Sequence, residues 1–196
     1  MLKQLKKICL DRWFTFARAE TGVAAIEFVM VAPPIFLMLG MILETGVMFF
    51  AQYSLQAAVE SAARTVRTGA VQTNNVSSAN FKNEICNYVG TLMNCAGAVT
   101  VYVRSDPDFA TMVKNLPPLI NIGPSTGTTT VSAPPCYNPG NPSQPAVIIA
   151  TYDWYFTSWG MSSVWGNVAG NKANRLTALT VFKNQAYPGS TSTSCP

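Results

Sequence analysis

Few side chains in this sequence are suited to catalysis. The chain has no histidine, so it lacks the residue that most often acts as general base, proton shuttle or metal ligand. Asp106, Asp108 and Asp153 could form an acid pair or a metal site, but their spacing fits no calcium-binding loop, and the sequence contains no phosphate-binding loop. The sequence therefore predicts neither an enzyme nor a protein with a metal or another cofactor.

The carboxylate in the most unusual setting is Glu27. It is the only charged residue between Gly22 and Leu43. The 21 residues from Val23 to Leu43 are long enough to cross the hydrocarbon core of a bilayer as a helix. Because a secretory signal has a shorter apolar core, the sequence predicts a transmembrane helix in contact with membrane lipid, with an acidic group near its N-terminal end.

The segment before this helix is basic. Residues 1–22 have five basic and two acidic side chains, whereas the rest of the chain has eight basic and seven acidic ones. Positive flanks tend to stay in the cytoplasm, so we expect a single-pass inner-membrane protein with a cytoplasmic N-terminus and a periplasmic C-terminal domain. The balanced charge beyond residue 22 offers no basic face to nucleic acid.

The five cysteines divide between the two sides of this helix. Cys9 lies in the basic leader, and the other four follow the apolar run. In an oxidising compartment these four can form two disulfides, and three pairings are open. We favour Cys86 with Cys95, nine residues apart around Gly90, and Cys136 with Cys195, which would tie the end of the chain to the middle of the domain.

The helical pattern continues beyond Leu43. A single helix from about Val23 to about Thr68, ending at Gly69, would be roughly 69 Å long and would protrude from the membrane. One face carries apolar residues at helical spacing, namely Leu55, Val59, Ala62 and Val66. Small residues where another helix could approach closely are Gly40, Gly46, Ala57 and Ser61, although such residues are often only good helix formers.

The remainder, residues 69–196, has the pattern of a small α+β domain. A short helix is predicted over 81–93, and strands over 99–104, 146–156 and 175–185. The first two strands are separated by residues 117–145, a long loop rich in Pro, Gly, Ser and Asn. We expect a leader at 1–22, a transmembrane and protruding helix at 23–68, and a periplasmic domain at 69–196 with an antiparallel sheet of three or four strands.

One constellation of residues is informative about function. Gly22 follows a basic leader, and Glu27 and Phe28 come five and six residues later, at the start of the apolar run. This arrangement resembles the processing site of type IV pilin-like proteins. Together with Ala32-Pro33, Glu44-Thr45-Gly46 and residues 49–52, it is similar to the TadE-like family of minor pseudopilins of the tight-adherence (Tad/Flp) pilus.

The resemblance implies that a prepilin peptidase cuts after Gly22, leaving Val23 as the new N-terminus and Glu27 as the fifth residue. The new amine and the carboxylate are both costly in hydrocarbon, and pairing between neighbouring subunits would offset that cost. The implied partners are the peptidase, other minor pseudopilins, the major pilin and the inner-membrane pilus platform. The implied outcome is assembly of an adhesive pilus, for surface attachment and biofilm formation. Incorporation of the protein into the filament is compatible with this outcome.

Two other functions fit the same sequence. The protein could be an uncleaved, membrane-anchored scaffold, which would retain its leader. It could also be a tip adhesin that binds glycans through an aromatic cluster, consisting of Tyr152, Trp154, Tyr155, Phe156, Trp159 and Trp165. An enzyme using Asp106 or Asp153 is the weakest alternative, because no nucleophile motif accompanies them.

Overall fold

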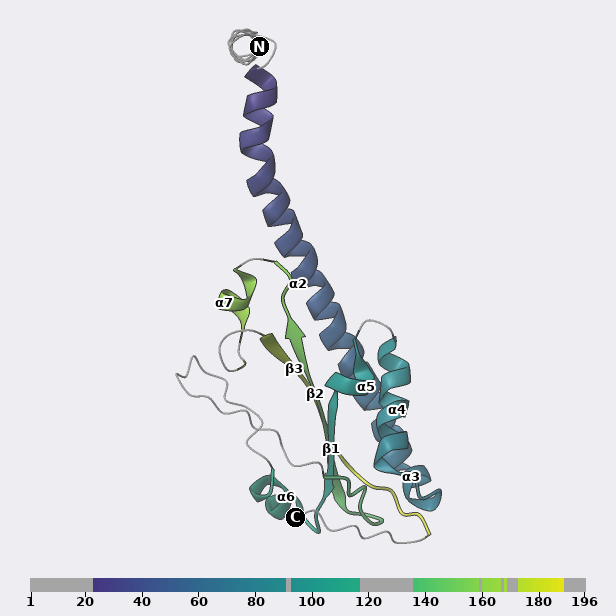
Figure 1. Cartoon of the computed structure of the whole chain (residues 1–196). Coiled ribbons are helices and arrows are strands. Elements are labelled where there is room, and N and C mark those ends of the chain that lie inside the picture. The colour runs from purple at the N-terminus through teal and green to yellow at the C-terminus, as the bar shows by residue number, and fades with distance from the viewer. Residues whose placement is uncertain are drawn as a thin grey trace, which may run out of the picture. The chain divides into compact units, whose positions relative to one another are not determined.

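The computed structural model describes residues 23–90, 93–116, 136–158, 160–166, 168 and 173–188. The chain forms two compact units, Met1–Leu43 and Glu44–Pro196. Helix α2 (Val23–Arg67) supplies the described residues of the first unit and the first element of the second (Figure 1). The helix predicted from about Val23 to about Thr68 is therefore present.

The end of α2 is fixed by a glycine in the left-handed conformation. Gly69 has a φ of 82°, and a side chain there would collide with the ring of Tyr187. The N–H of Gln185 donates to the carbonyl of Arg67 at 2.9 Å, which satisfies one of the carbonyls that a helix end leaves free. Three short helices follow: α3 (Ala70–Thr73), α4 (Ser78–Val89) and α5 (Cys95–Ala98).

The second unit contains an antiparallel sheet in the order β1-β2-β3. Its strands are β1 (Thr100–Ser105), β2 (Pro145–Tyr155) and β3 (Ala173–Lys183), with Val103 opposite Ile148 and Ile148 opposite Thr180. The predicted strands are thus confirmed with shifts of one or two residues. The short helix predicted over 81–93 is present as α4, three to four residues earlier. Four other short helices were not predicted: α3, α5, α6 (Phe109–Lys114), which follows β1, and α7 (Met161–Trp165), which lies between β2 and β3.

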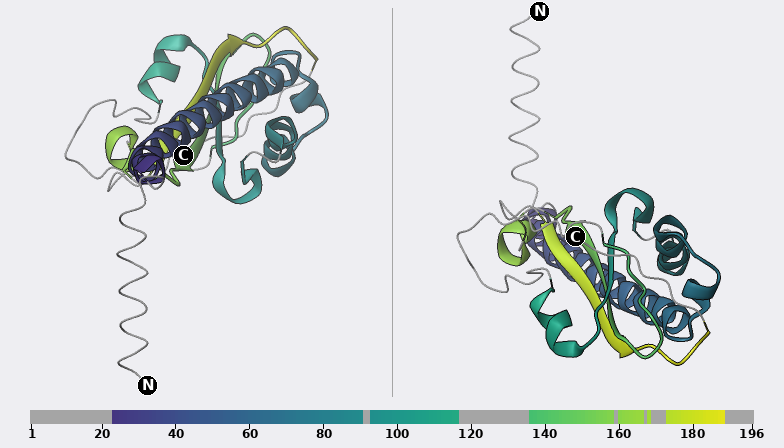
Figure 2. Two further views of the ribbon diagram at one scale, coloured as in Figure 1. Left: turned by 90° about the horizontal axis from the view of Figure 1, so that it is seen from above. Right: turned by 90° about the horizontal axis from the view of Figure 1, so that it is seen from below.

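Both faces of the sheet are covered. On one face the second half of α2 and helix α4 bury Leu55, Val59, Phe81 and Ile85 against Ile148 and other strand residues, and Figure 2 shows α2 lying along the sheet. On the other face Met112 of α6 packs with Tyr102, Val147 and Ile149. Each fully buried aliphatic side chain contributes about 1.5–3 kcal/mol. The predicted α+β class, a long helix followed by a small antiparallel sheet, is confirmed.

Candidate membrane anchor and assembly surface

The first half of α2 is apolar on every side. Its large apolar side chains, such as Leu37, Met30 and Leu43, are 48–74% exposed. Within the described part of the chain, α2 is the one helix long and apolar enough to span a membrane. A helix without a polar face needs non-aqueous surroundings, so this half of α2 is suited to membrane anchoring.

The predicted processing residues lie at the start of this helix. As described, α2 begins at Val23, and Gly22 with the rest of the leader lies outside the described residues. Glu27 and Phe28 are exposed in the first two turns. Residues 23 and 27 are four positions apart in a helix, which puts them on the same face.

None of the four small residues predicted to pack against another helix is buried inside this chain. No described atom lies within 4 Å of a Cβ placed on Gly40 or Gly46. Ala57 is exposed and Ser61 is half-buried. The small residues that α2 buries in its own core are others, namely Ala51, Ala58, Ala62 and Ala63. In contrast, the predicted face of Leu55, Val59, Ala62 and Val66 is fully buried.

The apolar surface of α2 continues into the second unit. Val47, Phe49, Phe50 and Tyr53 are 43–72% exposed, although each comes after the apolar run that ends at Leu43. The core-facing residues Met48 and Ala51 alternate with them and are buried. This part of α2 therefore has two apolar faces, one packed on the sheet and one exposed.

Sequence reasoning missed the role of Glu44. Its carboxylate accepts hydrogen bonds from the backbone N–H groups of Thr157 and Ser158, the latter at 3.0 Å. Partial burial opposes ionisation, but the hydrogen bonds from Ser158 and Thr157 outweigh it and lower the pKa of Glu44. Glu44 thus holds the segment after β2 beside α2, and no local pattern could have indicated a partner 113 residues away.

Two further polar residues of α2 contact the sheet. The Nε2 of Gln52 donates to the carbonyl of Thr177 at 2.9 Å, and Gln56 contacts the backbone of Leu179. Their spacing of four residues on an otherwise apolar helix was the available signal.

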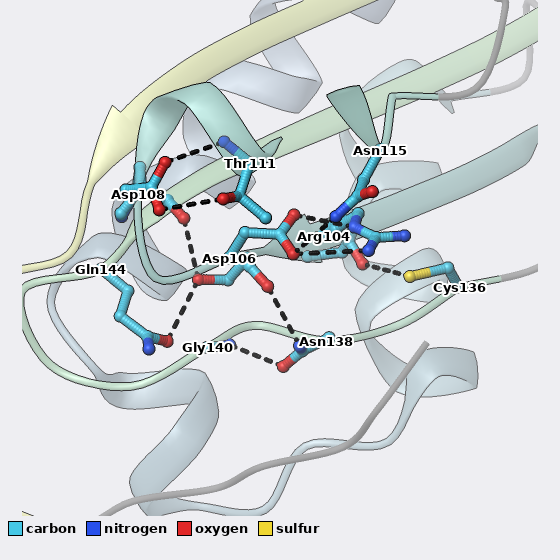
Figure 3. A network of polar contacts seen from close by, with 12 residues as sticks. Arg104, Asp106, Asp108, Thr111, Asn115, Cys136, Asn138, Gly140 and Gln144 are labelled. Atoms are coloured by element: carbon cyan, nitrogen blue, oxygen red, sulfur yellow. Dashed lines mark hydrogen bonds and ion pairs between the residues drawn. The ribbon is translucent and has the colours of Figure 1, made fainter. Parts of the chain in front are cut away.

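The three aspartates considered for chemistry form ion pairs or cap a helix within the protein. Asp106 is paired with Arg104, with Nε and Oδ2 2.8 Å apart, and accepts a hydrogen bond from Asn115 (Figure 3). The hydrogen bond that Arg104 itself donates to Asp106 raises the pKa of Arg104.

Asp108 caps helix α6 by accepting hydrogen bonds from the N–H and hydroxyl of Thr111. Asp153 is paired with Arg175 at 2.7 Å across β2 and β3. Within the described ranges, no group of three or more Cys, Asp and Glu side chains is placed to hold a metal.

The aromatic cluster is divided between core and surface. Tyr152, Trp154 and Phe156 are half-buried and pack against the core. Tyr155 and Trp165 are 67% and 44% exposed. Trp159 lies outside the described residues. The structure therefore does not gather the five described residues of the cluster on one open face.

The helix and its first contacts with the sheet have a family counterpart. Residues 22–64 match the model of the TadE-like proteins. The matched segment is therefore similar to the TadE-like family. TadE-like proteins are pilin-like, are associated with Tad pilus systems and are generally not enzymes. No curated protein and no solved structure matches the chain.

The TadE-like segment, residues 22–64, covers most of α2 and ends before Gly69. It includes Gly22, Glu27 and Phe28, as well as the sheet-contacting residues Glu44 and Gln56. The sheet and its connecting helices lie beyond the match. The similarity to the family therefore covers the apolar half of α2 and most of the helix face on which the sheet packs.

Three cysteines after the TadE-like segment, all in the described part of the chain, are disulfide-bonded. Cys86 of α4 is bonded to Cys95 of α5, with Cα atoms 5.4 Å apart; this is the pairing we favoured. Cys136 is also disulfide-bonded, and its sulfur lies 3.2 Å from the carbonyl oxygen of Val103. Cys195, its expected partner, lies outside the described residues.

Proposed function

We propose that this protein is a minor pilin or pseudopilin that supports assembly of a Tad-type adhesive pilus. A prepilin peptidase removes residues 1–22, residues 23–68 form the transmembrane and protruding helix, and residues 69–196 act in the periplasm. Its partners are other minor pseudopilins, the major pilin and the pilus platform.

The observation that carries this proposal is the apolar half of α2. Most of its large apolar side chains from Ile26 to Leu43 are exposed, and it lies within the TadE-like match that begins at Gly22. Lipid covers such a surface while the protein is an anchor, and apolar helices of other subunits cover it in a filament. The open small-residue positions Gly40 and Gly46 would let such helices approach closely.

Glu27 has a specific part in this proposal. A cut after Gly22 places a positive amine at Val23, on the helix face that carries the Glu27 carboxylate. Both charges are expensive in hydrocarbon. An ion pair between the amine of one subunit and Glu27 of its neighbour removes this cost and fixes their stagger.

Processing is tested by the intact mass of the protein from native membranes, with and without the cell's prepilin peptidase. We expect a peptidase-dependent form that begins at Val23. Gly22→Leu should abolish it, because a bulky side chain keeps the peptidase from the backbone, whereas Gly40→Leu is the matched control and should be cut normally. A full-length form in both strains would leave the uncleaved scaffold as the function.

The role of Glu27 is tested separately from cleavage. Glu27→Ala should be cut normally but should lower the amount of pilus sheared from cells, and Glu27→Asp should retain more pilus than Glu27→Ala. Normal pilus yield from Glu27→Ala would exclude the ion-pair model. Loss of cleavage in this variant would move Glu27 from assembly to peptidase recognition.

A further inference from the structure

The segment between β2 and β3 combines exposed aromatic residues with a complete lack of charge. From Trp154 to Asn171 it has no acidic or basic residue, and it contains three of the chain's four tryptophans. Tyr155, Val164 and Trp165 are 67%, 75% and 44% exposed, whereas Met161 of α7 is buried and fastens this segment to the domain. We call residues 154–168 the α7 segment.

The α7 segment is held at the place where the second unit begins. Glu44, the first residue of this unit, accepts the N–H groups of Thr157 and Ser158. Glu44 directly follows Leu43, the last residue of the apolar run. When α2 crosses a bilayer with Leu43 at the outer end of the span, the contact with Glu44 keeps the α7 segment close to the lipid surface.

The two ends of the second unit differ in chemistry. Figure 1 shows α7 at one end of the sheet and α3 at the other. The exposed residues of α3 and of the turn after it are polar, including Thr73, Asn74, Asn75 and Ser77, whereas α6, at the same end in Figure 1, exposes Phe109 and Val113. At the α7 end, exposed Phe49 and Phe50 of α2 accompany the aromatic residues of the α7 segment. Because Glu44, the residue that follows the apolar run, binds the α7 segment, the α7 end is the one suited to the boundary between headgroups and acyl chains.

We propose that the α7 segment is a second membrane contact, with Trp165, Val164 and Tyr155 in the headgroup region of the bilayer that α2 crosses. Tryptophan and tyrosine favour this region because their rings are apolar and their N–H or O–H remains hydrogen-bonded. The uncharged segment enters it without desolvating an ion. Two points of attachment fix the orientation of the domain on the membrane, which a single helix cannot do.

This inference rests on the membrane anchoring in the proposed function, but not on cleavage or pilus assembly. The full chain is reconstituted into phosphatidylethanolamine and phosphatidylglycerol nanodiscs whose acyl chains are brominated near the headgroup. Bromine quenches nearby tryptophan fluorescence. Trp165→Phe should lower the quenched fraction of the emission, because it removes a lipid-exposed indole.

Trp154→Phe is the matched control, since Trp154 is half-buried against the protein core. It should leave the quenched emission in place and remove unquenched emission. Glu44→Gln should reduce the quenching of Trp165 by releasing the segment from α2. If Trp165→Phe leaves the quenched fraction unchanged, the α7 segment does not touch lipid and the proposal is wrong.

The same samples separate the failure of this inference from failure of the anchor. A chain released from membranes by alkaline carbonate would overturn the anchoring itself. A chain that resists carbonate while Trp165 is unquenched overturns only the α7 contact. Binding of glycans, or of a pilus protein, that depends on Trp165 in such a sample would assign the segment to that ligand instead.

Discussion

The side-chain amide of Gln56 pairs with the backbone of Leu179 as a neighbouring strand would. Its Oε1 accepts the N–H of Leu179 and its Nε2 donates to the carbonyl of Leu179, both at 3.3 Å. Gln52, one turn earlier, binds the carbonyl of Thr177. β3 is an outer strand of the sheet, and free edges recruit other chains. The two glutamines therefore cover this edge from the helix side.

Removing both amides should expose this edge. We expect Gln52→Ala/Gln56→Ala to speed hydrogen exchange at the Leu179 amide and to cost about 0.5–1.5 kcal/mol of unfolding free energy per hydrogen bond. The double variant should also self-associate more readily in detergent. Glu60→Ala is the control, because Glu60 bonds to Gln56 but not to β3. Unchanged exchange at Leu179 would contradict the edge-covering role.

The Glu44 contact should depend on pH. Its pKa is lowered by hydrogen bonds from Ser158 and Thr157 that outweigh burial. A lowered pKa means that the contribution to stability is present above the ordinary value of 4.5 and is lost as the pH falls below it. Hydrogen exchange at Thr157 and Ser158, corrected for its intrinsic pH dependence, should show weaker protection at acidic pH. Glu44→Gln should weaken the protection at neutral pH and remove its pH dependence.

Gly69 should tolerate substitution less well than Gly160. Both have positive φ, 82° and 83°, so alanine is strained at each by roughly 1–2 kcal/mol. Only at Gly69 would the new Cβ also collide with the ring of Tyr187, since Gly160 has no atom within 4 Å. Chemical denaturation should show a larger loss for Gly69→Ala. Adding Tyr187→Ala to that variant should recover part of the excess, because it removes the ring but leaves the Cβ of residue 187 at 2.8 Å. Equal losses at both glycines would refute the clash.

Tyr137 should titrate late. Burial, aided by the nearby charge of Glu84, raises its pKa to about 12, and its hydroxyl donates to the carbonyl of Val76 at 2.9 Å. Because the pKa is raised, this contribution to stability is present below the ordinary value of 10 and is lost between about pH 10 and 12. Absorbance titration of the wild type minus Tyr137→Phe should isolate a tyrosine with this delayed ionisation. A difference curve centred near 10 would contradict it.

The Cys86–Cys95 disulfide should stabilise the second unit moderately. It links residues nine positions apart, and closing so short a loop contributes about 2.5 kcal/mol in the chain-entropy model. Cys86→Ser/Cys95→Ser should lower the free energy of unfolding by that amount. Cys9→Ser should not change it, because Cys9 belongs to the leader, and an equal loss in that variant would point to a different pairing.

Local patterns predicted what depends on local spacing. Leu55 and Val66 lie on a helical stripe that is visible in the sequence, and it is the buried face of α2. The strands follow from runs of β-branched and aromatic residues. Cys86 forms its disulfide with Cys95, which is only nine positions further along the chain. In each case the necessary information lies within a few residues.

The contacts that sequence reasoning missed join distant residues. Glu44 meets Thr157, and Gln56 meets Leu179, because the sheet folds back on α2. A polar residue on an apolar helix indicates a partner without saying which one. Helix α6 was missed because it has only six residues. Its N-cap, Asp108, was considered only as a member of an acid pair or a metal site. α7, even shorter, lies in an aromatic run that resembles a strand.

The bond from Gln185 to Arg67 closes the domain with its last elements. Ribosomes make α2 first and β3 last, so the apolar stripe around Leu55 is made more than 100 residues before the last strand that helps to cover it. At roughly 5–20 residues per second this delay is about 5–20 s. During that time the half-made protein has an adhesive apolar groove and no finished interior. A nascent chain cut short before Ala173 cannot complete the domain, which makes the final strand the step that commits the protein to its native state.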